Sequence, residues 1–266
     1  MNKKIFVFSN QTPSSLAAGR ALCGKLDNSG YTVTRTYSED AELMVCIGGD
    51  GTFLEAIHKY NFPTIPIIGI NTGHLGFFQE IMPDQLDDFI FNYSQGNYTL
   101  QPLSTVRLRI ICGDQTHEHI GLNEVSIKGI NSYNVHLNLS IGGSFIERFS
   151  GDGLVVATPA GSTAYNYSLG GSIVDPRLNL LQITPIAPMN TTAYRAFTSS
   201  ILLPSDLSLG LIPDMSSDTA IAICRDGYTT EYSDVREMTV DYSDIKVNLI
   251  RFEGYDFWTK VKSKFL

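Results

Sequence analysis

The sequence predicts an α/β N-terminal domain with a doubly wound, Rossmann-like parallel sheet, followed by an all-β C-terminal sandwich domain. Over residues 1–100, apolar runs alternate with helical repeats, which is the pattern of strands and covering helices. Over residues 101–252, apolar and polar positions alternate and helical periodicity is nearly absent. The length of 266 residues suits one large or two modest domains. We therefore place the domain boundary near residue 100.

The N-terminal domain is expected to alternate buried strands with helices. Strands of the kind that a parallel sheet covers on both faces are expected at residues 5–8, 43–47 and 65–70. Helices are expected at residues 12–30, 53–62 and 83–93. Thr12 and Pro13 are typical of a helix start, as N-cap and first-turn proline. A short amphipathic helix at 257–261 is expected to pack back on this domain, so residues 253–266 are assigned to it.

The C-terminal domain is expected to consist of strands joined by tight turns. Apolar positions alternate with Arg107 and Arg109, which indicates a half-buried strand with a basic outer face. Further strands are expected at 135–141, 145–149 and 221–224 and around positions 240 and 247. The pair Gly142-Gly143 predicts a two-residue hairpin turn between the first two of these.

The charge and the cysteine content exclude several classes of protein. Asp and Glu total 27 against 19 for Lys and Arg, and this net charge of −8 argues against binding to nucleic acid or to anionic membranes. No apolar run reaches the roughly 18 residues that a membrane span needs. The four cysteines form no C-x-x-C pair, so we expect reduced thiols in a cytoplasmic protein, without disulfides or structural zinc.

The strongest local motif is Gly48-Gly49-Asp50-Gly51-Thr52, which lies between a predicted buried strand and the following helix. Glycines at such a place let backbone amides approach a phosphate, and the helix dipole favours an anion. Asp50 does not fit a simple anion site, because a carboxylate repels phosphate. It fits either a base that takes a proton from a hydroxyl nucleophile or a holder of a divalent cation. A tight turn with Asp50 as N-cap is the structural alternative.

A second glycine-rich loop, residues 71–78, follows the next predicted strand. It places His74 between two glycines and leads to Phe77 and Phe78. These aromatic residues either border the cleft of Asp50 and present a ring to a base, or close the turn as core residues. The sequence leaves both interpretations open.

Two more features suggest a nucleoside pocket. Asn123 and Glu124 can hold ribose hydroxyls or an adenine edge, although such a pair is commonest at an ordinary hairpin edge. Residues 151–171 form a loop dense in small, hydrogen-bonding residues, which a purely structural loop rarely needs. Its hydroxyls, small residues and aromatic ring come from Thr158, Ser162, Thr163, Ser168, Gly161, Ala164 and Tyr165.

Other polar groups have simpler explanations. His117 and His119 would share one strand face, but no third metal ligand is evident, so a solvated hairpin is the better interpretation. Arg225-Asp226-Gly227 predicts a hairpin turn, from which Asp226 could also contact substrate. The fingerprint G-x-G-x-x-G does not follow the first strand, which weakens a dehydrogenase interpretation.

Taken in order, these motifs resemble those of the NAD kinase family. The likeness rests on Gly-Gly-Asp-Gly-Thr, Asn-Thr-Gly-His-Leu-Gly-Phe, Asn-Glu, and Asp-Gly-Leu with Thr-Pro-x-Gly-Ser-Thr-Ala-Tyr and Gly-Gly, over roughly residues 43–195. The first motif is shared with phosphofructokinases and lipid kinases, whereas the second and fourth are specific. The resemblance implies transfer of the terminal phosphoryl group of ATP to the 2′-hydroxyl of the adenosine ribose of NAD, which yields NADP.

The resemblance also assigns roles to individual residues. Asp50 would be the general base that takes the proton of the ribose hydroxyl. Phosphates would be bound by Gly48, Gly49, Thr52 and Arg148. The NAD pocket would be lined by Gly51, Phe77, Asn123, Glu124, Asp152, Thr163, Ala164, Tyr165 and Ser168, and more loosely by Ala187 and Tyr194 from a neighbouring subunit.

The resemblance further implies Mg²⁺ carried with the donor, and a homo-oligomer, often a tetramer. One departure is that relatives carry a basic residue where this chain has Ser150, so Arg148 is the substitute to consider. The sequence leaves open whether polyphosphate also serves as donor and whether NADH is an acceptor. Two alternatives remain: a lipid or sugar kinase that shares only the Gly-Gly-Asp-Gly-Thr loop, and a non-catalytic dinucleotide sensor, which would not need Asp50.

Overall fold

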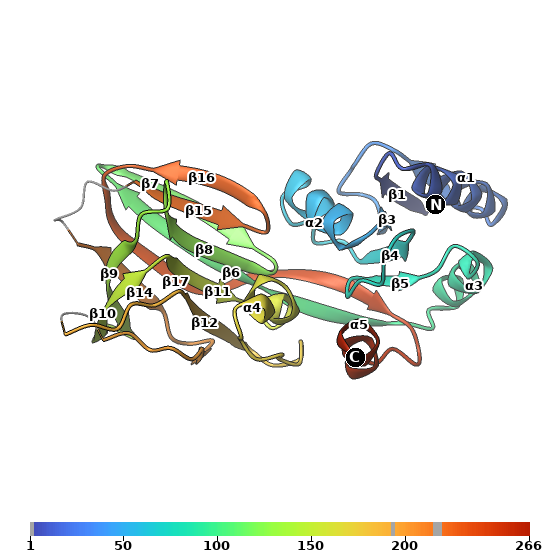
Figure 1. Ribbon diagram of the computed structural model, residues 1–266. Helices are drawn as coiled ribbons and strands as arrows, with labels where there is room; N and C mark the ends of the chain where they lie inside the picture. Colours follow the sequence, from blue (N-terminus) through green and yellow to red (C-terminus); the bar gives the residue numbers. More distant parts are fainter. Residues whose placement is uncertain (1–2, 193–194, 215–219) are drawn as a thin grey trace. The chain divides into compact units, whose positions relative to one another are not determined.

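The chain folds into two compact units, shown in the computed structural model of Figure 1. The structure describes residues 3–192, 195–214 and 220–266. The first unit comprises Met1–Leu103 and Lys246–Leu266, and the second comprises Ser104–Ile245. The first unit therefore contains both the beginning and the end of the chain.

The first unit is an α/β layer around a parallel sheet. Its strands are β1 (Lys4–Ser9), β2 (Thr32–Thr34), β3 (Leu43–Gly48), β4 (Ile67–Asn71), β5 (Gln79–Ile81) and the end of β17 (Val235–Arg251). They lie in the order β2–β1–β3–β4–β17, with β5 beside β4, and these pairings are parallel. The helices are α1 (Pro13–Asn28), α2 (Asp50–Lys59), α3 (Leu86–Gln95) and α5 (Phe257–Phe265). The chain goes from β1 to one side and then returns to the other, as in a doubly wound sheet.

Both faces of this sheet are covered. All residues of β3 are buried. On one face, Ile5 and Val45 share a core with Leu22 of α1 and Phe89 of α3. On the other face, the ring of Phe6 meets that of Tyr60 edge-on, with 5.1 Å between centroids, directly after α2. The expected α/β class is therefore confirmed, and it explains why these strands are apolar at successive positions.

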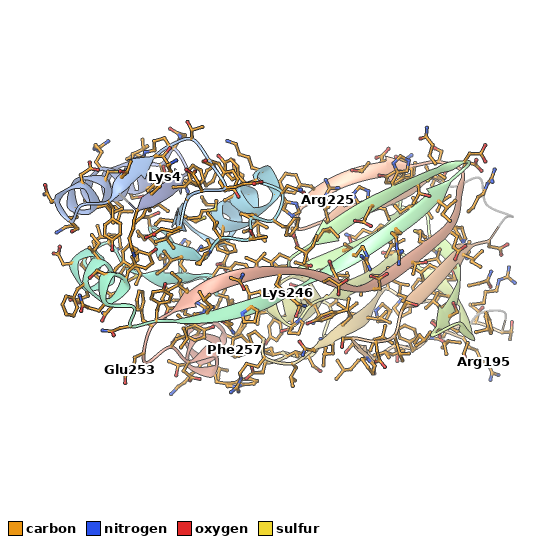
Figure 2. All side chains as sticks on the ribbon, turned by 180° about the vertical axis from the view of Figure 1, so that it is seen from behind. Lys4, Arg195, Arg225, Lys246, Glu253 and Phe257 are labelled. Atoms are coloured by element: carbon orange, nitrogen blue, oxygen red, sulfur yellow. The ribbon has the colours of Figure 1, made fainter. Side chains whose placement is uncertain are left out.

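Side-chain caps begin the first and the last helix of this unit. Thr12 caps α1 and accepts a hydrogen bond from the backbone N–H of Ser15. Asp256 caps α5 and accepts from the N–H groups of Trp258 and Thr259. Phe257, labelled in Figure 2, begins α5, which continues to Phe265 and is longer than the sequence pattern indicates.

The second unit consists of two largely antiparallel sheets. One contains β10 (Ser144–Gly151), β9 (Val135–Ile141), β14 (Leu209–Pro213) and the start of β17, together with β6 (Thr99–Cys112) and β7 (Gln115–Gly121). The other runs in the order β13 (Ile201–Pro204), β12 (Leu180–Ile186), β11 (Gly153–Ala157), β8 (Glu124–Gly129), β15 (Ile221–Arg225) and β16 (Tyr228–Tyr232). Its described helical segments are the short η1 (Ala160–Thr163) and α4 (Tyr165–Ser168).

The two sheets of the second unit share one apolar core. Val106, Leu137 and Val240 of the first sheet pack in the same cluster as Ile127 and Val156 of the second sheet. Alternate residues of each strand point into this cluster, which is the pattern of a β-sandwich. The expected all-β C-terminal fold is thus confirmed.

Local details of this unit follow the sequence with one difference. The turn between β9 and β10 has φ of 56° at Gly142 and 82° at Gly143, the left-handed conformation that a two-residue hairpin needs. The strands expected around 240 and 247 are one continuous strand, β17. Ser243 breaks the apolar alternation there, yet its side chain is buried and accepts a hydrogen bond from the N–H of Ile245.

The basic face of β6 is partly neutralised within the same sheet, because two arginines share one aspartate. Arg107 and Arg109 both form ion pairs with Asp241 of β17, at 2.7 and 2.6 Å.

Within the described residues, no helix is long and apolar enough to cross a membrane. All four cysteines are free.

Candidate functional site

The Gly48–Thr52 turn joins the end of β3 to the start of α2. Gly49 is the N-cap residue, is extended, and makes no side-chain capping hydrogen bond. The first N–H groups of a helix have no partner within the helix, so the start of α2 presents free donors and the positive end of its dipole. Gly51, in this first turn, is exposed. The turn therefore has the features of an anion-binding site.

Close packing explains the glycine at position 48. A Cβ atom there would lie 2.2 Å from the hydroxyl oxygen of Thr52. Thr52 is buried, and its hydroxyl oxygen accepts a hydrogen bond of 3.0 Å from the amide of Asn10. The Thr52 side chain thus packs against Gly48 and links the turn to Asn10.

Asp50 is held by the second glycine-rich loop. Its Oδ2 accepts from the N–H of Phe77 at 3.0 Å, and its Oδ1 accepts from the N–H of Phe78 at 3.1 Å. A Cβ atom at Gly76 would lie 2.3 Å from Oδ1 of Asp50, so only glycine fits beside the carboxylate. The ammonium of Lys264 lies 3.7 Å from Oδ2. The first two sequence motifs therefore form one structure around Asp50.

The two phenylalanines of this loop pack as core residues. Phe78 stacks on Phe53 of α2 with 4.7 Å between ring centroids. Phe77 is 8% exposed and contacts the rings of Phe257 and Phe265. Of the two interpretations that the sequence leaves open, burial favours the structural one for Phe78. His74 is exposed.

In the second unit, Asp226 holds the Asn123–Glu124 turn. Its carboxylate accepts the backbone N–H groups of Leu122, Asn123 and Glu124 at 2.6, 2.8 and 3.1 Å. Arg225, labelled in Figure 2, ends β15, and Asp226 follows it in the hairpin turn with φ of 45°. The predicted hairpin is present, and its aspartate fixes a turn about a hundred residues away in the sequence.

Polar atoms of this turn are buried with no hydrogen-bond partner among the described residues. They are Oδ1 of Asn123 and Oε2 of Glu124. Burial, and then the charge of Asp226, raises the pKa of Glu124 to about 8. A buried acceptor without a partner costs free energy, which a ligand that supplies the missing hydrogen bond recovers.

The loop after β11 packs directly on this turn. The N–H of Thr158 donates to the carbonyl of Asn123 at 2.8 Å, and its hydroxyl donates to that of Leu122 at 2.6 Å. A Cβ atom at Gly161 would lie 1.9 Å from the carbonyl oxygen of Asn123. The third and fourth sequence motifs therefore also form one structure.

Two hydroxyls that the sequence offers to a ligand are used inside the protein. That of Thr158 bonds the turn, and that of Ser162 donates to the carbonyl of Val174 and accepts from its N–H. Both side chains are fully buried, so their interpretation as ligand groups is wrong. Asn166, which the sequence analysis does not single out, is also buried and bonds Ser162 and Thr184.

The other expected pocket residues are accessible. Thr163, Ala164 and Tyr165 are half-buried and Ser168 is exposed. The ammonium of Lys128 lies 4.6 Å from the centre of the Tyr165 ring. Thr163 lies on η1, and Tyr165 and Ser168 lie on α4, the two short helical segments that follow β11.

Residues near Ser150 are placed as follows. Ser150 is fully buried and contacts the sulfur of Met189. Arg148 forms an ion pair with Asp214, so its charge already has a partner. Asp152 and Ala187 are exposed, and Ala187 has φ of 44°. Tyr194 lies outside the described residues.

His119 belongs to a buried polar chain. Its Nδ1 faces Arg225 at 2.6 Å and its Nε2 faces the hydroxyl of Tyr232 at 2.6 Å. Burial, followed by the nearby charge of Arg225, lowers the pKa of His119 to about 4. His117 packs against the Tyr232 ring. No group of three metal-ligating side chains occurs among the residues that the structure describes.

Sequence reasoning missed three contributors: Asp226 as an anchor, Asn166, and Lys264 beside Asp50. The sequence around Asp226 indicates only a turn residue or a substrate contact. A short helix at the C-terminus was expected, but nothing in its pattern indicates which lysine meets Asp50. Pairing between distant segments carries these contacts, and local spacing does not show it.

Comparison with known proteins agrees with this architecture. Residues 9–98 match the ATP-NAD kinase N-terminal domain, and residues 122–252 match the ATP-NAD kinase C-terminal domain. The chain is 39% identical to the NAD kinase of Finegoldia magna over 100% of this chain and 98% of the relative. It is 33% identical to the NAD kinase of Latilactobacillus sakei over 99% and 97%.

Solved structures share the fold. A yeast NADH kinase complexed with NADH superposes with a TM-score of 0.85 at 21% identity, covering 99% of this chain and 87% of the other. An Archaeoglobus fulgidus NAD kinase in complex with ATP superposes with a TM-score of 0.74 at 23% identity, covering 99% of each chain.

The fold and these relatives define a kinase, an enzyme that transfers phosphoryl groups. The chain belongs to the ATP-NAD kinase family. The relatives do not favour a lipid or sugar kinase or a non-catalytic sensor.

Proposed function

We propose that this protein transfers the terminal phosphoryl group of ATP to the 2′-hydroxyl of the adenosine ribose of NAD, with Asp50 as general base. The ribose oxygen forms a bond to phosphorus, the bond to the ADP oxygen breaks, and Asp50 accepts the hydroxyl proton. The products are NADP and ADP. One observation carries the proposal: Asp50, the first residue of α2, is held beside the helix N-terminus by the backbone N–H groups of Phe77 and Phe78.

The hydrogen bonds of Asp50 suit a base. Each carboxylate oxygen has two lone pairs, and each accepts one backbone N–H, so acceptor capacity remains for a hydroxyl. The side chain is 27% exposed, which lets a substrate reach it. Fixed orientation reduces the reorganisation that proton transfer requires.

We propose that the second unit supplies the nucleoside pocket. Asn123 and Glu124 would bind the adenosine half of NAD through their buried, unpartnered oxygens. Asp152 would face the nicotinamide end. The remaining lining residues would be Thr163, Ala164, Tyr165, Ser168, Ala187 and Tyr194. Gly51 and Phe77 of the first unit are also proposed to bind NAD. The ring of Phe77 is buried, so its contact with a base would use an edge.

Phosphate binding is proposed at the start of α2. Gly48, Gly49 and Thr52 would bind through backbone groups, and the Thr52 hydroxyl, which accepts from Asn10, keeps its own O–H to donate. Arg148 is paired with Asp214 and would have to exchange this partner to bind a phosphate. We therefore assign the main part of phosphate binding to the turn.

A divalent cation, proposed as Mg²⁺, would arrive on the donor phosphates and neutralise their charge. The residues fit this mode, because the Asp50 oxygens accept N–H groups and Asp50 is not in a cluster of three metal-ligating side chains within the described ranges.

We also propose a homo-oligomer, such as a tetramer, and a cytoplasmic location, which suits four free thiols. The proposal also divides the chain into two functional domains. The first comprises residues 1–100 and 253–266, and the second, which binds NAD, comprises residues 101–252.

Donor and acceptor profiling tests the proposal. NAD, NADH and diacylglycerol are offered as acceptors, with ATP or polyphosphate and Mg²⁺. We expect phosphorylation of NAD with ATP, and phosphorylation of the lipid alone would overturn the assignment. Repeating the assay after chelation of divalent cations tests the metal, and light scattering measures the oligomer.

A further inference from the structure

The Gly48–Thr52 turn contains an electrostatic conflict. Its free N–H groups attract an anion, but Asp50 places a negative charge in the same turn. A bound phosphoryl group would meet this carboxylate at close range. A cation beside Asp50 would remove the conflict, and the structure places one there: Lys264, with its Nζ 3.7 Å from Oδ2 of Asp50.

Lys264 is held by the loop that holds Asp50. Its Nζ donates to the carbonyl of Leu75 at 3.1 Å and lies 5.1 Å from the centre of the Phe77 ring. Phe77 also contacts Phe257 and Phe265, which anchor α5 on both sides of the lysine. The ammonium is therefore fixed by one carbonyl, one ring and one carboxylate.

The lysine one helical turn earlier is used differently. Lys260 donates to the carbonyl of Gln79 and lies 3.8 Å from Glu80, and its side chain is only 16% exposed. Burial, together with the charge of Arg251, lowers its pKa to about 8. The side chain of Lys264 is 35% exposed. An ammonium has three donors, and Lys264 uses one for the carbonyl of Leu75, so donors remain for a phosphate oxygen.

We propose that Lys264 binds the phosphoryl group that ATP transfers and offsets the negative charge of Asp50. This inference rests on the proposed function of the Asp50 turn. The ammonium lies 3.7 Å from the carboxylate, so its positive charge would reduce the repulsion that the donor phosphates meet on binding. The C-terminal helix is then part of the phosphate site.

The test compares three variants of the full-length protein. Lys264→Met removes the charge and keeps the length, Lys264→Arg keeps the charge, and Lys262→Met is the control on an exposed position of the same helix. We expect Lys264→Met to lower kcat/KM for ATP about 10- to 100-fold, the loss of one charged hydrogen bond. The KM for NAD should change less than about twofold. Lys264→Arg should recover most of the loss, and Lys262→Met should match the parent.

Two results would overturn the role of Lys264. One is equal kinetics in Lys264→Met and Lys262→Met. The other is an equal loss for ATP and NAD with a lower Tm, which would mean that the lysine only supports the helix. Calorimetric binding of ATP with Mg²⁺ in the absence of NAD tests Lys264 separately from the acceptor. If the parent binds ATP but does not phosphorylate NAD, the proposed function fails. The role of Lys264 in ATP binding is then still measured by calorimetry of the parent and Lys264→Met.

Discussion

The Asp50 turn of the first unit and the Asn123–Glu124 turn of the second unit each carry a candidate carboxyl group, and the two groups use their hydrogen-bonding capacity in opposite ways. Both oxygens of Asp50 accept a backbone N–H, and an ammonium lies 3.7 Å away. Glu124 instead has a buried oxygen that makes no hydrogen bond within the described part of the chain, and its pKa is raised to about 8. The oxygens of Asp50 therefore have their hydrogen bonds already made, whereas the raised pKa of Glu124 favours its protonated form, which can donate as well as accept.

This difference fits the two proposed roles, Asp50 as the catalytic base and Glu124 as a group that binds the nucleoside. A base must be oriented before the substrate arrives, and the two backbone hydrogen bonds of Asp50 provide this orientation. A binding group gains most if its own hydrogen bonds stay unmade until the ligand supplies them. Replacing each carboxylate by an amide therefore gives unequal results, which the following variants measure.

The largest effect is expected for Asp50→Asn. We expect kcat to fall by about two to four orders of magnitude, because the amide cannot take the hydroxyl proton. Binding of NAD, measured by calorimetry, should be retained. Asn can accept only one of the two N–H groups from Phe77 and Phe78, so a small drop in Tm is also expected.

Glu55→Gln on the same helix is the control, because Glu55 is exposed. It should keep the activity of the parent. Unchanged turnover in Asp50→Asn would rule out the role of Asp50 and remove the basis of the comparison.

A smaller loss is expected for Gly76→Ala. The new methyl group would lie 2.3 Å from Oδ1 of Asp50 and 2.1 Å from Oε1 of Gln79, so the carboxylate must shift. A displacement of this kind costs about 10- to 100-fold in kcat. Gly73→Ala, in the same loop, has no atom within 4 Å of its new methyl group and should be nearly silent. Equal kinetics in the two variants would show that the position of the carboxylate is not critical.

The general architecture of both turns could be predicted from sequence, because it depends on local patterns. Apolar runs at 43–47 and 65–70 indicate covered strands, and glycines after them indicate turns at the sheet edge. The sandwich follows from alternation along strands such as β9. These features need only neighbours in the sequence.

The contacts that distinguish the turns could not be predicted in this way. Asp226 bonds Leu122, and Lys264 approaches Asp50, across more than a hundred residues. Thr158 looks like a ligand group in sequence, but it is buried by packing on the Asn123 turn. Contacts between segments that are distant in the sequence determine which polar groups remain free. The spacing of residues along a single sequence does not show these contacts.

An intermediate effect is expected for Asp226→Asn. The variant loses the charge that accepts three backbone N–H groups, so the Asn123–Glu124 turn should loosen. We expect the KM for NAD to rise about tenfold and the free energy of unfolding to fall by about 2 kcal/mol. Asp234→Asn is a matched control, since Asp234 also lies in a turn with positive φ, 54°.

Comparing the KM for ATP with the KM for NAD in Asp226→Asn tests this prediction. The KM for ATP should stay constant while the KM for NAD rises, since Asp226 belongs to the nucleoside turn. If both values rise together, the aspartate supports the whole unit and not the turn alone. Denaturant unfolding of both variants measures the stability change.

The smallest effect on turnover is expected for Glu124→Gln. Gln donates and accepts as a protonated Glu does, so we expect kcat/KM for NAD to change less than about fivefold at pH 7. A loss as large as that of Asp50→Asn would mean that both groups act as anions. Glu118→Gln, an exposed position on β7, serves as control.

The pH dependence of stability gives the sharper test of Glu124. A carboxyl whose pKa is about 8 in the folded protein and 4.5 ordinarily binds its proton more tightly when folded. Its contribution to stability is therefore complete below pH 4.5 and is lost as the pH rises to about 8, on the order of a few kcal/mol. Glu124→Gln should lack this decline, so urea unfolding between pH 5 and 9 should show its stability rising relative to the parent. Parallel pH curves for the two proteins would show that Glu124 is ionised throughout, and the contrast with Asp50 would then fail.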